Sequence, residues 1–435
     1  MKIAQPVSNL QLAMILAALV IAFTSGVAPA QPSAQAPSGL WDASMQTLAG
    51  SVDFAVELTW EGDQLKAALL NASDRQQFTS ATWDGRLLTL RFDYYDGTLT
   101  ARRIVAEKME GEYSRQTSHG IVHLPLTMAP HRDVFFDKPW VGPSLTGEWT
   151  FHRPGEQGTE RITLAEFQQQ KVGNADGQVI VTGIFEPVSG DTGLLHGFVF
   201  RAEAGSPRFH LSRFDGIHVL AFDGEFLPDG RLKGQIGSGK SGISPFTATR
   251  SNQASGVDPN VQGSKLTRVS DPQQAFRFSG SDASGKTLDQ NSPEFKGKAL
   301  IIDIFGTWCP NCHDEAPVLE KIYERYRGEG LVIVGLAYEY TADQARDQRL
   351  MEIYRAKYGL SFPMLLAGTT ADGQIAQTLP QLIDFGAYPT TIFLDRQGRV
   401  HAIHAGFSGP ATGERYQQVQ QRFDALTREI VGSAN

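Results

Sequence analysis

The residues best suited to chemistry are two cysteines, Cys309 and Cys312, the only cysteines in 435 residues. They stand in a Cys-Pro-Asn-Cys-His segment, after an apolar run over 299–305 and before a helical pattern. A strand that delivers a Cys-x-x-Cys pair to the start of a helix predicts a thiol–disulfide redox centre. A bridge between such close residues closes a short loop and stabilises little, so reactivity explains the pair better.

The position of the pair predicts a separate role for each sulfur. Cys309 is expected at a helix N-terminus, where free backbone N–H groups and the helix dipole stabilise a thiolate. We expect it to be the exposed nucleophile that attacks a client disulfide. Cys312, one turn later, is expected to resolve the mixed disulfide. Pro310 suits the first helical position because its missing N–H is not needed there.

Several residues around the pair complete a family pattern. They are Trp308 directly before Cys309, Glu315 and Pro317 in a Cys-x-x-Glu-x-Pro segment, Tyr388-Pro389-Thr390-Thr391 before a strand, and 295–298 before the first core strand. Together they make residues 272–435 resemble the thioredoxin superfamily, in particular the exported TlpA/ResA-like thiol–disulfide oxidoreductases. The resemblance implies an α/β thioredoxin-like fold and a reducing dithiol.

Two carboxylates are expected to manage protons at the dithiol. The resemblance implies that Asp303, six residues before Cys309, is buried beneath the cysteines and relays the proton of the resolving thiol. TlpA-like proteins more often have asparagine there, so this chain departs toward the thioredoxin pattern. Glu315 lies three residues beyond Cys312, on the same helical face. Two carboxylates near one dithiol couple, and at least one pKa is expected to rise.

The remaining site residues are expected to meet the client. Pro389, if cis, would lie opposite the cysteines and leave the backbone of Tyr388 free to pair with an extended client segment. Trp308 is expected to cover the motif and shape the substrate surface. This set requires neither cofactor nor metal.

His313 leaves other chemistries open. The Cys-x-x-Cys-His spacing also satisfies the haem c attachment pattern, with His313 as axial ligand. A zinc site from Cys309, Cys312 and His313 would lack an evident fourth ligand. In the redox interpretation His313 is an exposed first-turn residue or one that tunes the thiolate.

The N-terminus predicts export. Lys2 is a weak positive region, 12–23 is an unbroken apolar run, and Ala28-Pro29-Ala30 supplies a cleavage pattern, so residues 1–30 are interpreted as a signal peptide. The apolar run is short for a membrane anchor. We expect a periplasmic or otherwise exported protein without a membrane span in the mature chain. The net charge of −8 argues against nucleic acid as a partner.

Residues 31–39 are interpreted as a flexible leader, and 40–250 as a β-rich domain, a sandwich or an up-and-down barrel. The expected strands include 52–60, 86–92, 179–185, 194–201 and 218–226. Four pairs of similar turns predict an internal duplication, with repeats over 40–135 and 145–250.

No catalytic set is evident in the β-rich domain. Three histidines, His119, His123 and His131, are interpreted as core or surface residues. His210 and His218 flank a hairpin turn and could face each other.

Residues 251–271 are interpreted as a linker, and 272–435 as alternating strands and helices. We expect strands over 299–305, 331–337, 364–367, 390–394 and 400–405. A capping box beginning at Thr341 is expected to open a helix that ends near Tyr358, and a last helix is expected over 414–431.

The sequence thus predicts an exported enzyme that reduces disulfides of client proteins and is itself reduced by an upstream membrane or soluble thiol donor, with the β domain binding or positioning the client. Three alternatives stay open at this point: a dithiol oxidase or isomerase, a client-binding protein whose redox pair is not catalytic, and a c-type haem protein.

Overall fold

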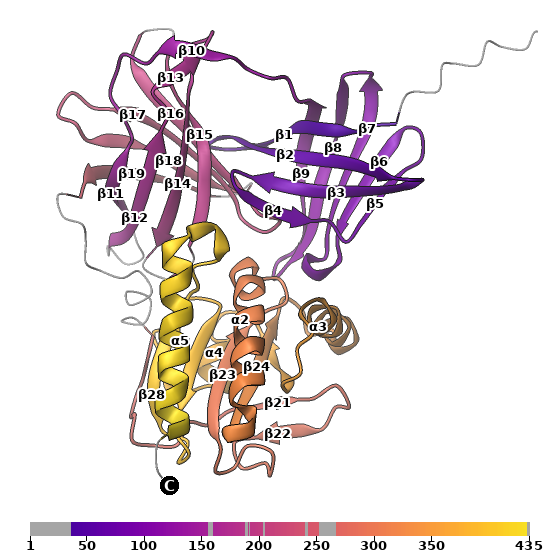
Figure 1. Ribbon diagram of the computed structural model, residues 1–435, viewed down its shortest axis with the longest axis vertical. Helices are drawn as coiled ribbons and strands as arrows, with labels where there is room; N and C mark the ends of the chain where they lie inside the picture. Colours follow the sequence, from indigo (N-terminus) through magenta and orange to yellow (C-terminus); the bar gives the residue numbers. More distant parts are fainter. Residues whose placement is uncertain are drawn as a thin grey trace, which may run out of the picture. The chain divides into compact units, whose positions relative to one another are not determined.

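The computed structural model describes residues 36–154, 160–187, 190, 192–202, 205–239, 242–251 and 267–432. The predicted signal peptide, residues 31–35 of the leader and residues 252–266 of the linker lie outside the described residues. The chain is multidomain, with a large all-β region followed by a thioredoxin-like α/β domain (Figure 1). None of the described helices is long and apolar enough to cross a membrane.

The first β module is a nine-stranded antiparallel sheet within the described residues. Its strands are β1 (Gly39–Thr47), β2 (Gly50–Glu61), β3 (Gln64–Asn71), β4 (Asp74–Gln77), β5 (Ser80–Trp83), β6 (Leu87–Phe92), β7 (Gly97–Val105), β8 (Lys108–Thr117) and β9 (Gly120–Pro130). Because β1 pairs with β9, only β4 and β5 are edge strands. In β2 every second residue from Val52 to Leu58 is buried, as the two-residue period of a strand requires. A short 3-10 turn, η1 (Asp93–Tyr95), joins β6 to β7.

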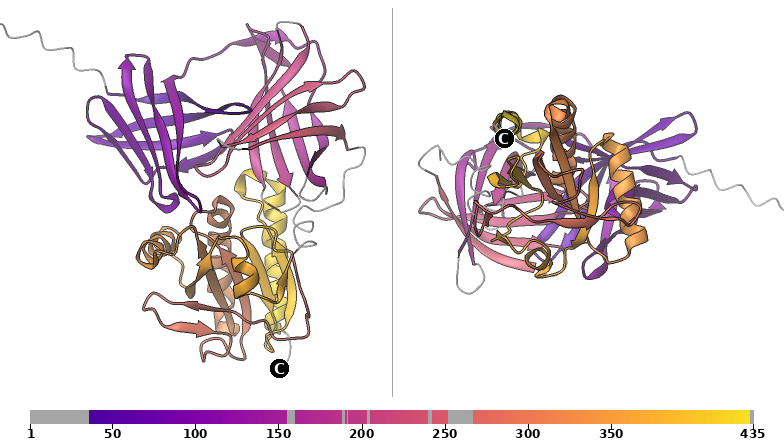
Figure 2. Two further views of the ribbon diagram at one scale, coloured as in Figure 1. Left: turned by 180° about the vertical axis from the view of Figure 1, so that it is seen from behind. Right: turned by 90° about the horizontal axis from the view of Figure 1, so that it is seen from below.

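The second β module is a closed barrel (Figures 1 and 2). Its strands are β11 (Gly147–Pro154), β12 (Glu160–Gln169), β14 (Val179–Pro187), β15 (Gly193–Arg201), β16 (Pro207–Phe214), β17 (Val219–Phe226), β18 (Leu232–Ser238) and β19 (Gly242–Arg250). Pairing of β11 with β19 closes the ring. Interlocking phenylalanine rings such as Phe151, Phe222 and Phe246 fill its core. A separate pair, β10 (Phe136–Pro139) and β13 (Val172–Asn174), lies outside the barrel.

The barrel alternative is therefore confirmed for the second module. The two modules cover the two predicted repeats, and Trp41 and Trp149 are buried in the first strand of each. One of the four turn pairs that suggested the duplication includes Gly62 and Gly190; these fall after the second strand of one module and after the third barrel strand of the other. The duplication stays a prediction.

The C-terminal domain has a seven-stranded mixed sheet among its described residues. In spatial order the strands are β22 (Thr287–Asp289), β21 (Ser279–Ser281), β25 (Met364–Thr369), β24 (Leu331–Glu339), β23 (Ala299–Phe305), β27 (Thr390–Leu394) and β28 (Val400–Ala405). The helices are α2 (Pro310–Tyr326), α3 (Gln344–Tyr358), α4 (Gln374–Thr378) and α5 (Glu414–Gly432), with 3-10 turns η3 (Arg327–Glu329) and η4 (Pro410–Thr412). All seven residues of β23 are buried, because both faces of the sheet are covered.

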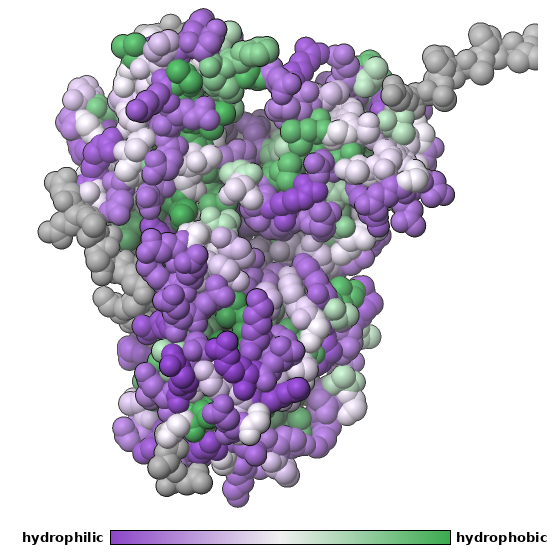
Figure 3. All heavy atoms as spheres, viewed as in Figure 1, coloured by the Kyte–Doolittle hydropathy of each residue, from purple (hydrophilic) through white to green (hydrophobic). Residues whose placement is uncertain are grey.

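Helices α2 and α5 pack side by side over the central strands (Figure 1). In α5, Val419, Phe423, Thr427 and Ile430 are buried at helical spacing. The face of these two helices seen in Figure 3 is mostly hydrophilic. Packing against the sheet and α5 therefore fixes the position of α2, and the N-terminus of α2 follows shortly after the end of β23.

Two boundaries differ from expectation. Helix α3 is capped by Asp343, whose side chain accepts the N–H of Arg346, and not by Thr341. Both residue types cap helices, so the sequence pattern alone did not separate them. The last part of the predicted linker already belongs to the domain, since Thr267 is fully buried and β20 (Arg268–Val269) pairs with β26 (Leu382–Ile383).

Candidate active site around Cys309 and Cys312

The turn between β23 and α2 is held from the neighbouring strand. The backbone N–H of Thr307 donates to Glu339 Oε1 at 2.9 Å, and the Thr307 hydroxyl donates to Oε2 at 2.8 Å. Burial raises the pKa of Glu339 to about 7. A side chain at Gly306 would collide with the ring of Trp308. The segment before the first cysteine is thus positioned by β24.

Cys309 is the N-cap of α2. Its Sγ accepts the backbone N–H of Cys312 at 3.3 Å, and Pro310 occupies the first turn as expected. Cys309 is 4% exposed and Cys312 1% exposed, so the expectation of an exposed nucleophile is wrong for this conformation. Burial, followed by the Cys309 thiol, raises the pKa of Cys312 well above its ordinary value.

The two predicted carboxylates meet beneath the dithiol. Asp303 on β23 and Glu315 on α2 are buried and share a hydrogen bond, and Thr391 on β27 donates to Glu315 Oε1 at 2.5 Å. Burial raises the pKa of Asp303 to about 7. Burial and the neighbouring Asp303 raise the pKa of Glu315 well above its ordinary value. The pair can therefore hold and release a proton near neutral pH, close to Cys312.

An aromatic cluster flanks the cysteine turn. The Trp308 indole N–H donates to Tyr338 O at 2.9 Å. The Trp308 ring stacks on Tyr340 at 4.6 Å and meets Tyr388 edge-on at 5.2 Å. The Tyr388–Pro389 peptide is cis, as the pattern predicted. Sequence reasoning missed Tyr340, although it follows the predicted strand 331–337 at the same sheet edge as the motif.

Residues of the first β module reach the first turn of α2. The rings of Tyr94 and Tyr95, in η1, lie 4.9 and 5.0 Å from the ring of His313. The Lys357 ammonium on α3 lies 3.6 Å from the centroid of the Tyr94 ring. A cation over an aromatic face is a favourable contact. These rings therefore bury His313, next to the second cysteine of the motif.

Polar contacts accompany the aromatic ones. Arg346 on α3 binds Asp96 beside η1 through two nitrogens, at 3.0 and 3.1 Å. Asn311, between the cysteines, donates to Thr192 O of the barrel module at 3.3 Å and to Phe407 O at 3.1 Å. Both β modules therefore contact the cysteine segment or its supporting helix. The contacts of Asn311 with Thr192 and of Arg346 with Asp96 join residues 119 and 250 positions apart, which no local pattern predicts.

His313 is not the exposed first-turn residue that its position suggested. It is buried, its Nδ1 lies 2.7 Å from the Tyr358 hydroxyl, and its Nε2 lies 2.8 Å from Thr307 O. Burial and then Lys357 lower its pKa well below the ordinary value, so the ring is neutral. Both ring nitrogens are engaged, which leaves neither free to bind a haem iron or a zinc ion. Its role in this structure is to anchor the turn.

The histidine pair proposed in the barrel module is also wrong. His210 lies opposite Asp223 in the β16–β17 register, with its Nδ1 3.6 Å from the Asp223 carboxylate. His218 instead contacts Asp215 at 2.8 Å. Each histidine thus has its own acidic partner, and the register does not place the two opposite each other. In the first module His123 and His131 are surface residues paired with acidic side chains, and His119 is exposed too.

Comparison with known proteins matches the C-terminal domain. Residues 268–419 match the family model described as Redoxin. Over 136 residues the chain is 29% identical to the thiol-disulfide oxidoreductase ResA of Halalkalibacterium halodurans, covering 31% of this chain and 68% of that protein. Over 163 residues it is 29% identical to the thiol:disulfide interchange protein DsbE of Yersinia pestis, covering 37% and 76%.

Solved structures give a match over the same region. A thiol:disulfide interchange protein of the thioredoxin family from Chlorobium tepidum is 25% identical, and the match covers 38% of this chain and 100% of that one, with a TM-score of 0.28. The C-terminal region of this chain is thus a Redoxin domain, and its relatives are thiol–disulfide oxidoreductases.

Proposed function

We propose that this protein is an exported thiol–disulfide oxidoreductase that reduces disulfides of client proteins through Cys309 and Cys312. The observation that carries the proposal is the placement of Cys309 and Cys312 at the N-terminus of α2, with a buried acid pair beneath them. Export is supported by the N-terminal apolar run and its Ala-Pro-Ala pattern.

The reaction is a two-step exchange. Cys309 Sγ, as thiolate, attacks one sulfur of the client disulfide; the client S–S bond breaks and a Cys309–client disulfide forms. Cys312 then attacks Cys309 Sγ, its proton passes to the Asp303–Glu315 pair, and the client leaves as a dithiol after taking up protons. The client gains two electrons and the Cys309–Cys312 pair loses two. An upstream thiol donor restores the reduced pair.

The role of the β region in this proposal is to position the client. Its residues contact His313, Asn311 and α3 beside the dithiol, Asn311 through the backbone carbonyl of Thr192. Cys309 is buried in this conformation, so a client reaches it only after a rearrangement, and we propose that the contacts of Tyr94 and Asp96 beside it separate in that step. The β region then controls which proteins approach the sulfur.

The test uses the fact that the chain has only two cysteines. Cys309→Ser is expected to reduce the rate of insulin disulfide reduction to that of the buffer dithiol alone. Cys312→Ser is expected to trap a mixed disulfide, seen as the added mass of one insulin molecule. Unchanged turnover in Cys309→Ser would overturn the proposal.

The double replacement of both cysteines is the matched control for binding. If the wild-type chain shows no turnover while the double variant keeps the same client affinity, the chain is a binding protein and the pair is not catalytic. Loss of turnover with retained affinity is the expected outcome for an enzyme.

A further inference from the structure

His404, on β28, is a fully buried histidine outside the site described above. In the strand register His404 lies directly opposite Thr391, and Thr391 lies directly opposite Asp303. Residues directly opposite in neighbouring strands project from the same face of a sheet. That face carries α2 and α5, because Thr391 donates to Glu315 and the His404 ring meets Phe423 edge-on at 5.0 Å.

The polar atoms of this layer are incompletely paired. Both ring nitrogens of His404 are buried and find no hydrogen-bond partner among the described residues. Buried polar atoms are nearly always satisfied by protein or by ordered water. A phenyl ring in this place beside Phe423 would leave no polar atom unpaired. Two unpaired nitrogens in the layer of the acid pair therefore point to an ordered water between them and the carboxyl groups.

We propose that His404 is a positioning residue of the dithiol site, whose ring N–H reaches the Asp303–Glu315 pair through a buried water and stabilises its ionised form. The inference rests on the proposed function. During resolution the Cys312 proton passes to a carboxylate of the pair, so a donor that favours the carboxylate lets the pair accept that proton at lower pH. No proton needs to reside on His404 itself.

The charges around His404 agree with a neutral donor. Asp303 and Glu315 face it across Thr391, and Arg422 approaches from α5. Burial and then Arg422 lower the pKa of His404 to about 3. The ring therefore keeps one N–H donor and one acceptor nitrogen over the pH range in which the dithiol works.

The test is the pH profile of mixed-disulfide resolution in the full chain, with insulin as the client. His404→Phe keeps the ring and removes both nitrogens; the midpoint of the profile is expected to rise by about one pH unit, which makes resolution about tenfold slower at pH 6 and unchanged at pH 9. His404→Gln, which retains a donor and an acceptor, is expected to restore most of the wild-type midpoint.

The outcomes separate this inference from the proposed function. A His404→Phe profile that superimposes on wild type, in an active protein, overturns the role of His404 and leaves the function standing. Equal slowing at all pH values in His404→Phe and His404→Gln also overturns it, because that pattern reports packing alone. A wild-type chain without any turnover instead contradicts the proposed function.

Discussion

At the scale of single residues, the chemistry depends on two carboxylic acids that the fold keeps out of water. Asp303 lies in the middle of β23 and is buried beneath Cys312. It shares a hydrogen bond with Glu315. Two acids coupled in this way lose their protons in two steps, and the pKa values of those steps belong to the pair and not to either residue. The pair can thus accept the proton of a buried thiol whose own pKa is raised.

The raised pKa of Asp303 makes stability depend on pH. In the unfolded chain this carboxyl ionises near 3.8, whereas in the fold it keeps its proton to about pH 7. The folded state therefore binds the extra proton between these values, and the free energy of unfolding falls as pH rises from about 4 to about 7. The difference corresponds to at most about 4 kcal/mol.

Asp303→Asn is expected to flatten this dependence. The variant should match wild type near pH 4, exceed it in urea midpoint at pH 8, and resolve mixed disulfides at least about a hundredfold more slowly. Urea unfolding of the reduced protein at both pH values and stopped-flow resolution measure the two effects. If Asp303→Asn is less stable than wild type at pH 8, Asp303 does not have the raised pKa assigned to it in the folded state.

At the scale of elements, the parts that local patterns predict well are those with strong apolar runs. The strands over 299–305, 390–394 and 400–405 form at the predicted residues, since each is an apolar run bounded by turn residues. The same runs carry Asp303 and place Pro389 before a strand. This part of the site was predictable because a motif and its spacing contain it.

The rest of the site depends on pairing between distant elements. The place of His404 follows from the β27–β28 register, and that of Tyr94 follows from a contact between η1 and α2. Neither residue lies in a motif, and each is an ordinary strand or turn residue in its local sequence. Their roles could not be predicted before the fold was known.

The contact of η1 with α3 is expected to control access to Cys309. In a Cys312→Ser background Cys309 is the only thiol, and Asp96→Asn removes the charge that binds Arg346. Asparagine tolerates the left-handed backbone of residue 96, so the turn itself is kept. Loss of about 1 kcal/mol in this partly buried pair should raise the iodoacetamide alkylation rate about fivefold.

The matched control is Asp93→Asn, the same change in the same turn. Asp93 pairs with Arg91 inside its own module, so its loss should leave the alkylation rate at the wild-type value. If Asp96→Asn and Asp93→Asn give equal alkylation rates, the Asp96–Arg346 ion pair does not restrict access to Cys309.

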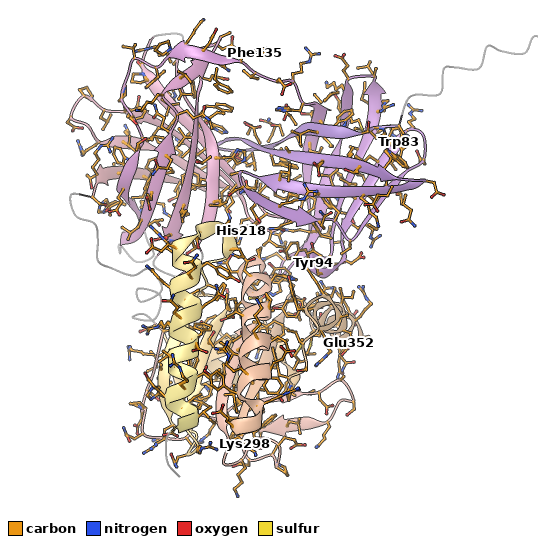
Figure 4. All side chains as sticks on the ribbon, in the orientation of Figure 1. Trp83, Tyr94, Phe135, His218, Lys298 and Glu352 are labelled. Carbon is orange, nitrogen blue, oxygen red and sulfur yellow. The ribbon has the colours of Figure 1, made fainter. Side chains whose placement is uncertain are left out.

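At the scale of the whole molecule, about 210 residues of β structure precede a domain that carries the dithiol. Nothing in their composition indicates that they contact the cysteine segment. The structure places contacts from both β modules there and leaves Cys309 4% exposed. Lys298, at the start of β23, marks the sheet end remote from the motif (Figure 4). The β modules contact the motif end of the domain through His313, Asn311 and Arg346, which fits a role in client access.

The most direct test of the central claim is the reduction potential of the Cys309–Cys312 pair in the full chain, measured by equilibration in defined dithiol/disulfide buffers and counting of free thiols by mass. The account predicts one two-electron transition near or below about −270 mV, as for thioredoxin. A value near about −120 mV, as for a strong dithiol oxidase, would contradict the reducing direction. A pair that forms no disulfide in any buffer would contradict the redox function altogether.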